Sequence, residues 1–184
     1  LAMAGDTAQV VALVRSHGLA AVLSGRARRL HAILADAAEQ DDREPVVALL
    51  LAAASLELDR KEEAEQWLVH LDLDGIADGP DPSLAVLAAA VGTALARFDL
   101  DVHVALERLQ RTPVDATGDP DLELYALQQR GVARIYTGDY QGAAADLRRA
   151  TVLARASGRD AMLISCLSFL AGNLVSMGDL ASSW

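Results

Sequence analysis

The sequence has little of several features that would assign it to a class of protein. Its single cysteine, Cys166, excludes an internal disulfide and suits a reducing compartment. The longest apolar runs, which begin at Val46 and Leu84, are far shorter than the roughly 20 residues that cross a bilayer. No positively charged segment with a cleavage site opens the sequence. We therefore expect a cytoplasmic protein that does not contact a membrane.

Positive charge is also scarce. Sixteen Lys and Arg residues stand against 26 Asp and Glu residues, which gives a formal net charge of −10. Such a surface repels phosphate backbones, so we expect this chain to contact no nucleic acid. Two small basic clusters, Arg26–Arg29 and Arg148–Arg149, are typical of solvated helix faces.

Motifs for catalysis and metal binding are missing. The acidic loop from Asp72 to Asp81 fails the calcium-loop pattern, because its position 5 is Ile76 and its position 12 is Ser83. The sequence contains neither G-x-S-x-G nor G-x-x-x-x-G-K-[ST]. The histidines lack the spacing of a zinc site, and we interpret them as partly exposed helix residues. We therefore expect no enzymatic activity, no metal and no cofactor in this chain. The four histidines are His17, His31, His70 and His103.

Apolar residues recur with the period of an α-helix nearly throughout, and no convincing strand pattern appears. Aromatic residues make up only 4% of the chain, so its interior has to come from helices that approach closely. The pairs Glu44-Pro45, Asp81-Pro82 and Asp119-Pro120 read as helix starts, in which the acidic residue caps the free amides. The fold class is therefore all-α. The predicted helices cover residues 6–17, 19–24, 26–40, 45–58, 60–72, 82–98, 101–111, 120–137, 139–157 and 160–177.

These helix starts alternate with turns at a common spacing. The three start prolines follow one another at nearly equal intervals, and Asp160 stands at the corresponding place after the last of them. The turns at Asp59, Leu100, Gly138 and Gly178 are spaced in the same way, and the turn at Gly25 resembles them. A shared period of about 40 residues indicates a helix-turn-helix repeat.

Small residues occur twelve positions apart across four of the turns, as close contact between two antiparallel helices requires. Gly131 sits inside a strong helix, where glycine costs roughly 1 kcal/mol relative to alanine, so a close helix contact would explain it. The first hairpin departs from this rule, because Gly18 is matched by Leu30. The predicted pairs are Ala52 with Ala64, Thr93 with Ala105, Gly131 with Ala143, and Ala171 with Ser183.

Stacked hairpins would form one helical-repeat array over residues 1–184, with approximate repeats at 18–40, 45–72, 82–111, 120–157 and 160–184. We see no domain boundary, and we expect the array to curve into a superhelix with a concave face. Because the sequence begins at Leu1 and stops just after a turn, we interpret it as a segment of a longer protein.

Residues 124–157 resemble the tetratricopeptide repeat. The glycines and alanines at Gly131, Gly138, Ala143 and Ala150 fall where that motif places its own, although Arg134 replaces a tyrosine of the motif. This resemblance implies a right-handed α-α superhelix whose concave face is lined by the first helix of each hairpin. That register selects Glu57, Arg97, Phe98, Tyr125, Gln128, Tyr136, Ser165 and Ser168 as candidate groove residues.

A wider resemblance covers nearly the whole chain. The segments SHGLAAVLSGRARRLHAIL, EPVVALLLAAASLELDRKEEAEQWL and YTGDYQGAAADLRRATVLARASG follow one another as in the helical-repeat region of bacterial LuxR-type regulators of the MalT-like group. In that family an ATP-binding module precedes the repeats and a DNA-binding helix-turn-helix follows them. The resemblance implies that the repeats receive a small-molecule inducer or a regulatory protein and help to control self-association.

The candidate groove mixes aromatic, amide, hydroxyl and charged side chains. Aromatic rings offer stacking area and polar groups fix orientation, so a sugar-like ligand or a peptide would fit. A general tetratricopeptide scaffold that grips a peptide from a partner is the alternative. It is less favoured because Arg97 is the only strong cation among the candidates. Each candidate residue could also simply fill space between successive repeats.

Overall fold

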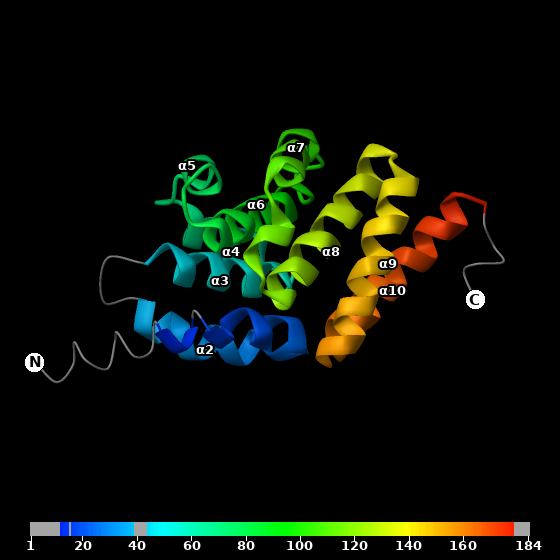
Figure 1. The fold of residues 1–184 in the computed structure, drawn as a ribbon. Coiled ribbons are helices and arrows are strands. Elements are labelled where there is room, and N and C mark those ends of the chain that lie inside the picture. The colour runs from blue at the N-terminus through cyan, green and yellow to red at the C-terminus, as the bar shows by residue number, and fades with distance from the viewer. Residues whose placement is uncertain (1–11, 15, 39–43, 179–184) are drawn as a thin grey trace, which may run out of the picture. The chain divides into compact units, whose positions relative to one another are not determined.

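The computed structural model describes residues 12–14, 16–38 and 44–178, and within these ranges every regular element is helical (Figure 1). The all-α prediction is therefore confirmed for the described part of the chain. The chain divides into two compact units, Leu1–Leu71 and Asp72–Trp184. The prediction of a single continuous array stays a prediction.

The first unit is built around one apolar helix. Helix α3 (Pro45–Leu56) contains no charged residue, and every residue from Ala48 to Leu56 is buried. It packs against α2 (Ala27–Ala38), which precedes it in the sequence, and against α4 (Lys61–Leu68), which follows it. Helices that are apolar all round need cover on several faces, and α3 receives it from its two neighbours.

A π-helical segment, Val22–Arg26, connects the helical residues 16–21 to α2. Within it Gly25 has a positive φ of 75°, a conformation that glycine adopts without steric cost. The turn predicted at Gly25 is therefore present, as a kink between two helical stretches. Gly18 has a separate reason to be glycine, because a Cβ there would lie 2.7 Å from Leu50 Cδ1 of α3.

The second unit is a succession of helices in which neighbours in sequence are neighbours in space. Helix α6 packs against α5, α7 and α8, and α9 packs against both α8 and α10. The 3₁₀ turn η2 contacts α6 and α8. The elements are α5 (Leu73–Ala77), α6 (Pro82–Ala96), α7 (His103–Arg111), η2 (Val114–Thr117), α8 (Pro120–Thr137), α9 (Tyr140–Ser157) and α10 (Asp160–Ser176).

Two of the three predicted carboxylate caps are confirmed. Asp81 accepts hydrogen bonds from the amides of Ser83 and Leu84, and Asp119 does the same for its own helix. Glu44, whose side chain is one methylene longer, makes no cap bond to α3, so that prediction is wrong. Its proline still stands in the first turn of the helix.

Every predicted intra-hairpin turn contains a residue in the left-handed conformation. The φ angles are 56° at Asp59, 57° at Leu100, 81° at Gly138 and 76° at Gly178. Asp59 and Leu100 are not glycine, and a positive φ is uncommon in residues other than glycine. The common spacing in the sequence thus marks positions of left-handed backbone, and at Asp59, Leu100 and Gly138 these lie between two described helices.

One of the predicted small-residue contacts is observed directly, and a second is shifted in register. Thr93 Oγ1 donates a hydrogen bond of 3.2 Å to the carbonyl of Ala105, as the twelve-residue spacing requires. A Cβ on Gly131 would lie 2.8 Å from Leu147 Cγ, so its nearest neighbour is one turn beyond the predicted Ala143. Ala52 and Ala64 are both fully buried, on the packed helices α3 and α4. The partner predicted for Ala171, Ser183, lies outside the described residues.

Candidate functional site

The structure places the eight candidate groove residues in different surroundings. Glu57 is exposed in the first unit, directly after α3. Phe98 and Tyr136 are exposed in the second unit, after α6 and near the end of α8. Arg97 is partly buried and its Nε donates to the carbonyl of Ala94 at 3.5 Å. These four side chains keep surface that a partner could contact.

Tyr125 and Gln128 do not face an open groove, because Tyr125 is fully buried and Gln128 is almost so. Gln128 Nε2 donates to Ser165 Oγ of α10 at 3.3 Å, so two of the candidates do meet across a helix interface. Ser168 is exposed, and its hydroxyl donates to the carbonyl of Ile164 within α10. The register derived from the resemblance therefore mixes interior positions with surface positions.

The interior beside Tyr125 is unusually polar. Gln129 is fully buried, and neither its amide oxygen nor its amide nitrogen has a hydrogen-bond partner in the described part of the chain. Gln128 Oε1 also has no hydrogen-bond partner in the described part of the chain. A buried amide group without a partner costs roughly 1–3 kcal/mol.

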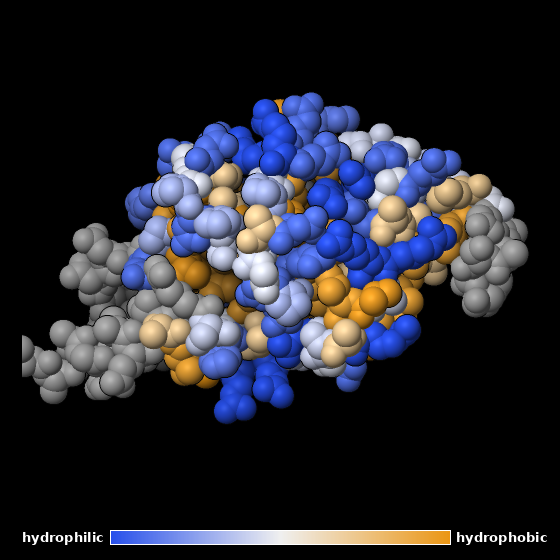
Figure 2. Space-filling view, in the orientation of Figure 1, coloured by the Kyte–Doolittle hydropathy of each residue, from blue (hydrophilic) through white to orange (hydrophobic). Residues whose placement is uncertain are grey.

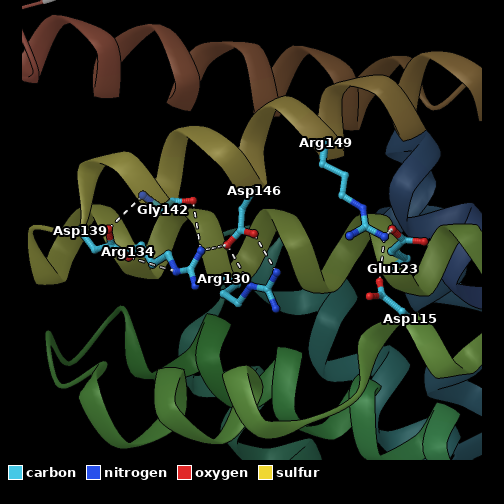
Figure 3. Close-up of polar contacts among 8 residues, drawn as sticks. All are labelled: Asp115, Glu123, Arg130, Arg134, Asp139, Gly142, Asp146 and Arg149. Carbon is cyan, nitrogen blue, oxygen red and sulfur yellow. Dashed lines mark hydrogen bonds and ion pairs between the residues drawn. The ribbon is translucent and has the colours of Figure 1, made fainter.

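A charged cluster joins α8 to α9, and it is the most extensive set of polar contacts drawn in Figure 3. Asp146 of α9 lies between Arg130 and Arg134 of α8. Arg130 binds both carboxylate oxygens, at 2.9 and 2.7 Å, and Arg134 Nη1 binds one of them at 2.7 Å. Asp146 is nearly buried and both guanidinium groups are largely so, which makes these charge-assisted bonds strong.

Arg134 extends the cluster toward the turn. Its Nη1 also donates to the carbonyl of Gly142, and its Nε lies 3.4 Å from the carboxylate of Asp139. Asp139 in turn caps α9 by accepting from the amide of Gly142. Arg134 therefore links the hairpin turn to the interface between α8 and α9.

Arg149 forms a second charged link, between α9 and the segments before it. Its Nη2 contacts Asp115 of η2 and Glu123 of α8, so this arginine is not the freely solvated residue that its sequence context indicated (Figure 3). Partial burial acts to lower the pKa of Arg149, but the charge of Glu123 and the hydrogen bond to Asp115 outweigh it, and the pKa is raised.

A third link joins α10 to α8. Arg159, at the start of α10, makes two hydrogen bonds of 2.8 and 2.6 Å to the carboxylate of Asp121 in the first turn of α8. This hydrogen bonding to Asp121 is the main reason that the pKa of Arg159 is raised. The link therefore connects the beginnings of two helices that are one sequence period apart.

The first unit has its own polar cluster, centred on Glu63 of α4. One carboxylate oxygen lies 2.9 Å from His31 Nε2 of α2, and the other accepts from Ser55 of α3 and from Arg60. The ring of His31 also meets Trp67 edge to face, with centroids 6.0 Å apart. The carboxylate stands between hydroxyl and imidazole, which differs from the arrangement that activates a serine, where the imidazole contacts the hydroxyl.

Carboxylates in the acidic loop act as caps and ion-pair partners. Asp72 caps α5 through the amide of Gly75, Asp81 caps α6, and Asp74 pairs with Arg108 of α7 at 2.8 Å. No group of three or more potential metal ligands occurs among the residues that the structure describes. In the same residues no helix is both long enough and apolar enough to cross a membrane.

Sequence reasoning missed the charged links that Asp146, Arg149 and Arg159 make in the second unit. Asp146 follows its partners Arg130 and Arg134 at separations of 16 and 12 along the chain. Opposite charges at such separations across an antiparallel hairpin were the signal that could have found the first link. In comparisons with known proteins, no family model matches the chain, and neither a curated protein nor a solved structure matches it.

Proposed function

We propose that this chain is the effector- or protein-sensing helical-repeat domain of a MalT-like, LuxR-type transcriptional regulator. The observation that carries the proposal is the recurrence of one backbone feature: a residue in the left-handed conformation occurs at Asp59, Leu100, Gly138 and Gly178, and at the first three of these it lies between two consecutive described helices. Hairpins repeated at this spacing present a series of equivalent helix faces to a partner. The regulator family itself is supported only by the order of the three sequence segments quoted above.

The burial of the candidate residues favours a protein or peptide over a small molecule as the effector. Tyr125 and Gln128, which would orient a small polar ligand, lie inside the second unit, whereas Phe98 and Tyr136 remain exposed. Exposed aromatic rings are favoured in contacts with proteins and peptides. The structure therefore supports a regulatory protein or peptide as the effector more than it supports a sugar-like inducer.

The mechanism that follows is differential binding. An effector that contacts one arrangement of the hairpins better than another shifts the population toward that arrangement, by as much as its affinities for the two differ. In a regulator, this shift would change how the neighbouring modules assemble. A cytoplasmic location and the absence of a cofactor in this domain remain predictions that belong to the same proposal.

A binding screen on the whole chain tests the proposal. The probes are a panel of neutral mono- and disaccharides and an array of peptides, each followed by thermal unfolding. A ligand at 100 times its Kd stabilises by about 2.7 kcal/mol, which corresponds to a rise in Tm of roughly 5–10 °C for a chain of this size. If no member of either panel raises the Tm, the sensing function is not supported.

Matched variants identify the surface involved. We expect Phe98→Ala and Tyr136→Ala to weaken binding of the active peptide at least about tenfold, since exposed aromatic anchors contribute most to such contacts. Tyr140→Ala, which removes another exposed tyrosine outside the candidate set, is the control and should bind normally. Equal losses in all three variants would contradict the assigned surface.

The general tetratricopeptide scaffold remains the second candidate, because the same exposed aromatic residues would serve an adaptor. The gene that encodes this chain distinguishes the two. A regulator requires an ATP-binding module before the repeats and a helix-turn-helix after them in the same product. A gene product that lacks both would exclude the regulator and leave the scaffold.

A further inference from the structure

Leu100 combines two properties that neither backbone preference nor burial explains. It lies at the end of α6, where its amide donates to the carbonyl of Arg97 and the amide of Asp101 donates to the carbonyl of Ala96. In this arrangement, the Schellman motif, the residue at the position of Leu100 is left-handed and is usually glycine. Leu100 has a φ of 57°, and it is 73% exposed. A leucine here is strained and also leaves most of its apolar side chain in contact with solvent.

The same pair of hydrogen bonds ends α3, α8 and α9, and the left-handed residues there avoid this conflict. They are Asp59 after α3, Gly138 after α8 and Gly158 after α9. Glycine has no Cβ to strain. Aspartate tolerates the left-handed conformation because its short polar side chain can form local hydrogen bonds. Leu100 has neither advantage, so its side chain has no evident role in forming the turn itself.

Other apolar side chains are exposed beside Leu100 along the chain. Phe98, two residues earlier, is 40% exposed, and Val104, in the first turn of α7, is 62% exposed. Figure 2 shows mainly hydrophilic surface over α7, so exposed apolar residues are not the rule in this part of the second unit. The reversal between α6 and α7 therefore presents apolar side chains to solvent on an otherwise polar surface.

Tyr136 of α8 extends this surface. The start of α7 packs against α8 through buried Val102 and Ala133. Tyr136 follows Ala133 by one helical turn, so it lies on the same side of α8 and closer to the end of that helix. Its side chain is more than half exposed. We refer to Phe98, Leu100, Val104 and Tyr136 together as the turn patch.

The charges around the turn patch indicate the chemistry of a partner. From the reversal into α7, the exposed residues that are charged at neutral pH are Asp99, Asp101 and Glu107, and all three are acidic. The nearest arginines are less available, because Arg97 is partly buried and Arg108 forms an ion pair. An apolar surface bordered by carboxylates is complementary to a segment that carries both apolar and cationic side chains.

We propose that the turn patch binds a segment of the effector in which an apolar side chain is flanked by Lys or Arg, and that Leu100 anchors this segment. The apolar side chain covers Leu100 and its exposed neighbours, and the cations reach the carboxylates of Asp99 and Asp101. Burial of the leucine in this contact removes apolar area from water, which its place in the turn does not achieve. A second copy of the chain is a poor occupant, because it brings a net charge of −10 to an acidic surface.

This inference rests on the proposed function, because it requires a protein or peptide effector. It adds the chemistry of the contacting segment, and it adds a binding residue, Leu100, that lies outside the candidate groove. The two can fail separately, since an effector of other chemistry, or one that binds without Leu100, would leave the sensing function standing.

Fluorescence polarisation with the whole chain tests the chemistry of the partner. Three sets of labelled peptides share the same apolar residues and differ at the flanking positions, which are Lys, Gln or Glu. We expect the Lys set to bind at least about tenfold more tightly than the Gln set. Added salt should weaken the binding of the Lys set, because exposed charges are screened.

Each outcome of this comparison has a definite meaning. Equal or tighter binding of the Gln or Glu set overturns the proposed chemistry and leaves the sensing function standing. If no set binds, the inference is overturned, and the proposed function then depends on the sugar and peptide screen described above.

Leu100→Gly tests the anchor through two readouts that should move in opposite directions. Relief of backbone strain should raise the Tm, whereas loss of the side chain should raise the Kd of the Lys set at least about tenfold. A purely structural residue would not combine a gain in stability with a loss of affinity. Leu100→Asn repeats the test without the added backbone freedom of glycine, since asparagine also tolerates a positive φ.

Asp59→Gly is the matched control for the anchor. It removes a side chain from the same left-handed position in the first unit and should leave the Kd of the Lys set unchanged. An unchanged Kd in the Leu100 variants, or an equal loss of affinity in Asp59→Gly, would overturn the role of Leu100.

Asp101→Asn tests the carboxylates. It should reduce both the preference for the Lys set over the Gln set and the salt dependence of binding, while the Kd of the Gln set stays unchanged. If the preference is the same as in the original chain, Asp101 does not select the cations and that part of the proposal is wrong.

Discussion

Helix α6 carries no charged residue, whereas α8, the first helix of the next hairpin, carries four. In the hairpin α6–α7, the cross-helix hydrogen bond from Thr93 to Ala105 joins a hydroxyl to a backbone carbonyl. In the hairpin α8–α9, the carboxylate of Asp146 binds Arg130 and Arg134. Arg134 also donates a hydrogen bond to the carbonyl of Gly142, close to the turn. The two hairpins reverse at Leu100 and Gly138, both left-handed.

This difference separates two contributions to hairpin packing. Small residues let two helices approach, which both hairpins achieve. Directional bonds between side chains also fix how far one helix slides along the other, and only α8–α9 uses charge for that purpose. We therefore expect α8–α9 to be sensitive to loss of charge and α6–α7 to be sensitive mainly to changes of volume.

The largest expected effect comes from Asp146→Ala. Removing the carboxylate leaves Arg130 and Arg134 facing each other in a largely buried interface, and breaking a buried pair in this way costs about 3 kcal/mol or more. Urea unfolding at neutral pH measures the loss. The control is Thr93→Val in the other hairpin, which should cost only about 1 kcal/mol. Equal losses would remove the distinction between the hairpins.

Replacing a glycine by alanine in the first helix of each hairpin, α8 or α6, should change the stability of the chain in opposite directions. A Cβ on Gly131 would meet Leu147 at 2.8 Å, so Gly131→Ala should destabilise by roughly 1–2 kcal/mol despite its better helix propensity. At Gly92 of α6 the nearest atom would be Leu73 Cδ1 at 4.0 Å, so Gly92→Ala should stabilise by up to about 1 kcal/mol. Thermal unfolding of the two variants is the measurement. A stabilising Gly131→Ala would show that Leu147 moves aside at little cost.

Substitutions at the two turn residues, Leu100 and Gly138, should change the stability of the chain in opposite directions. Leu100 has a φ of 57°, which costs a non-glycine residue about 1 kcal/mol, so Leu100→Gly should stabilise the chain by about that amount. Gly138→Leu imposes the same strain on the other hairpin and should destabilise it by about 1–2 kcal/mol. Differential scanning calorimetry of the pair checks the signs. If Leu100→Gly is destabilising, the leucine side chain contributes more through contacts than it loses through strain.

The smallest effect is expected at the exposed charged link. Asp115→Asn removes one of the two partners of Arg149, and because both side chains are more than half exposed, the loss should be roughly 0.5 kcal/mol or less. High salt should reduce it further. Chemical unfolding at low and high ionic strength measures both quantities. A loss as large as that of Asp146→Ala would contradict the view that burial decides the strength of these pairs.

Turn positions are predictable from the sequence because backbone reversal needs particular residues. Gly138 and Gly178 are evident as glycines, and Leu100 can be placed only because it falls at the common spacing. The sequence pattern predicts loops where the short elements α5 and η2 lie. Elements this short carry almost no periodic signal, and α5 depends on the side chain of Asp72 bonding to Gly75.

The candidate site is less predictable than the fold. A motif register assigns positions along a helix, but it cannot tell how many neighbours cover each position. Tyr125 is buried because four helices and η2 enclose α8, a fact that exists only after the helices have packed. The charged links of Asp146, Arg149 and Arg159 depend in the same way on which helices become neighbours, which is why the sequence context of Arg149 indicates a solvated residue.

The packing order of the second unit also has a kinetic consequence. Helices that follow one another in sequence pack against one another, and the main contacts that skip an element join helices such as α6 and α8. Short loops closed between adjacent segments have low entropy costs, and proteins rich in local contacts fold in microseconds to milliseconds. Folding of this unit can therefore start in any one hairpin and spread to its neighbours.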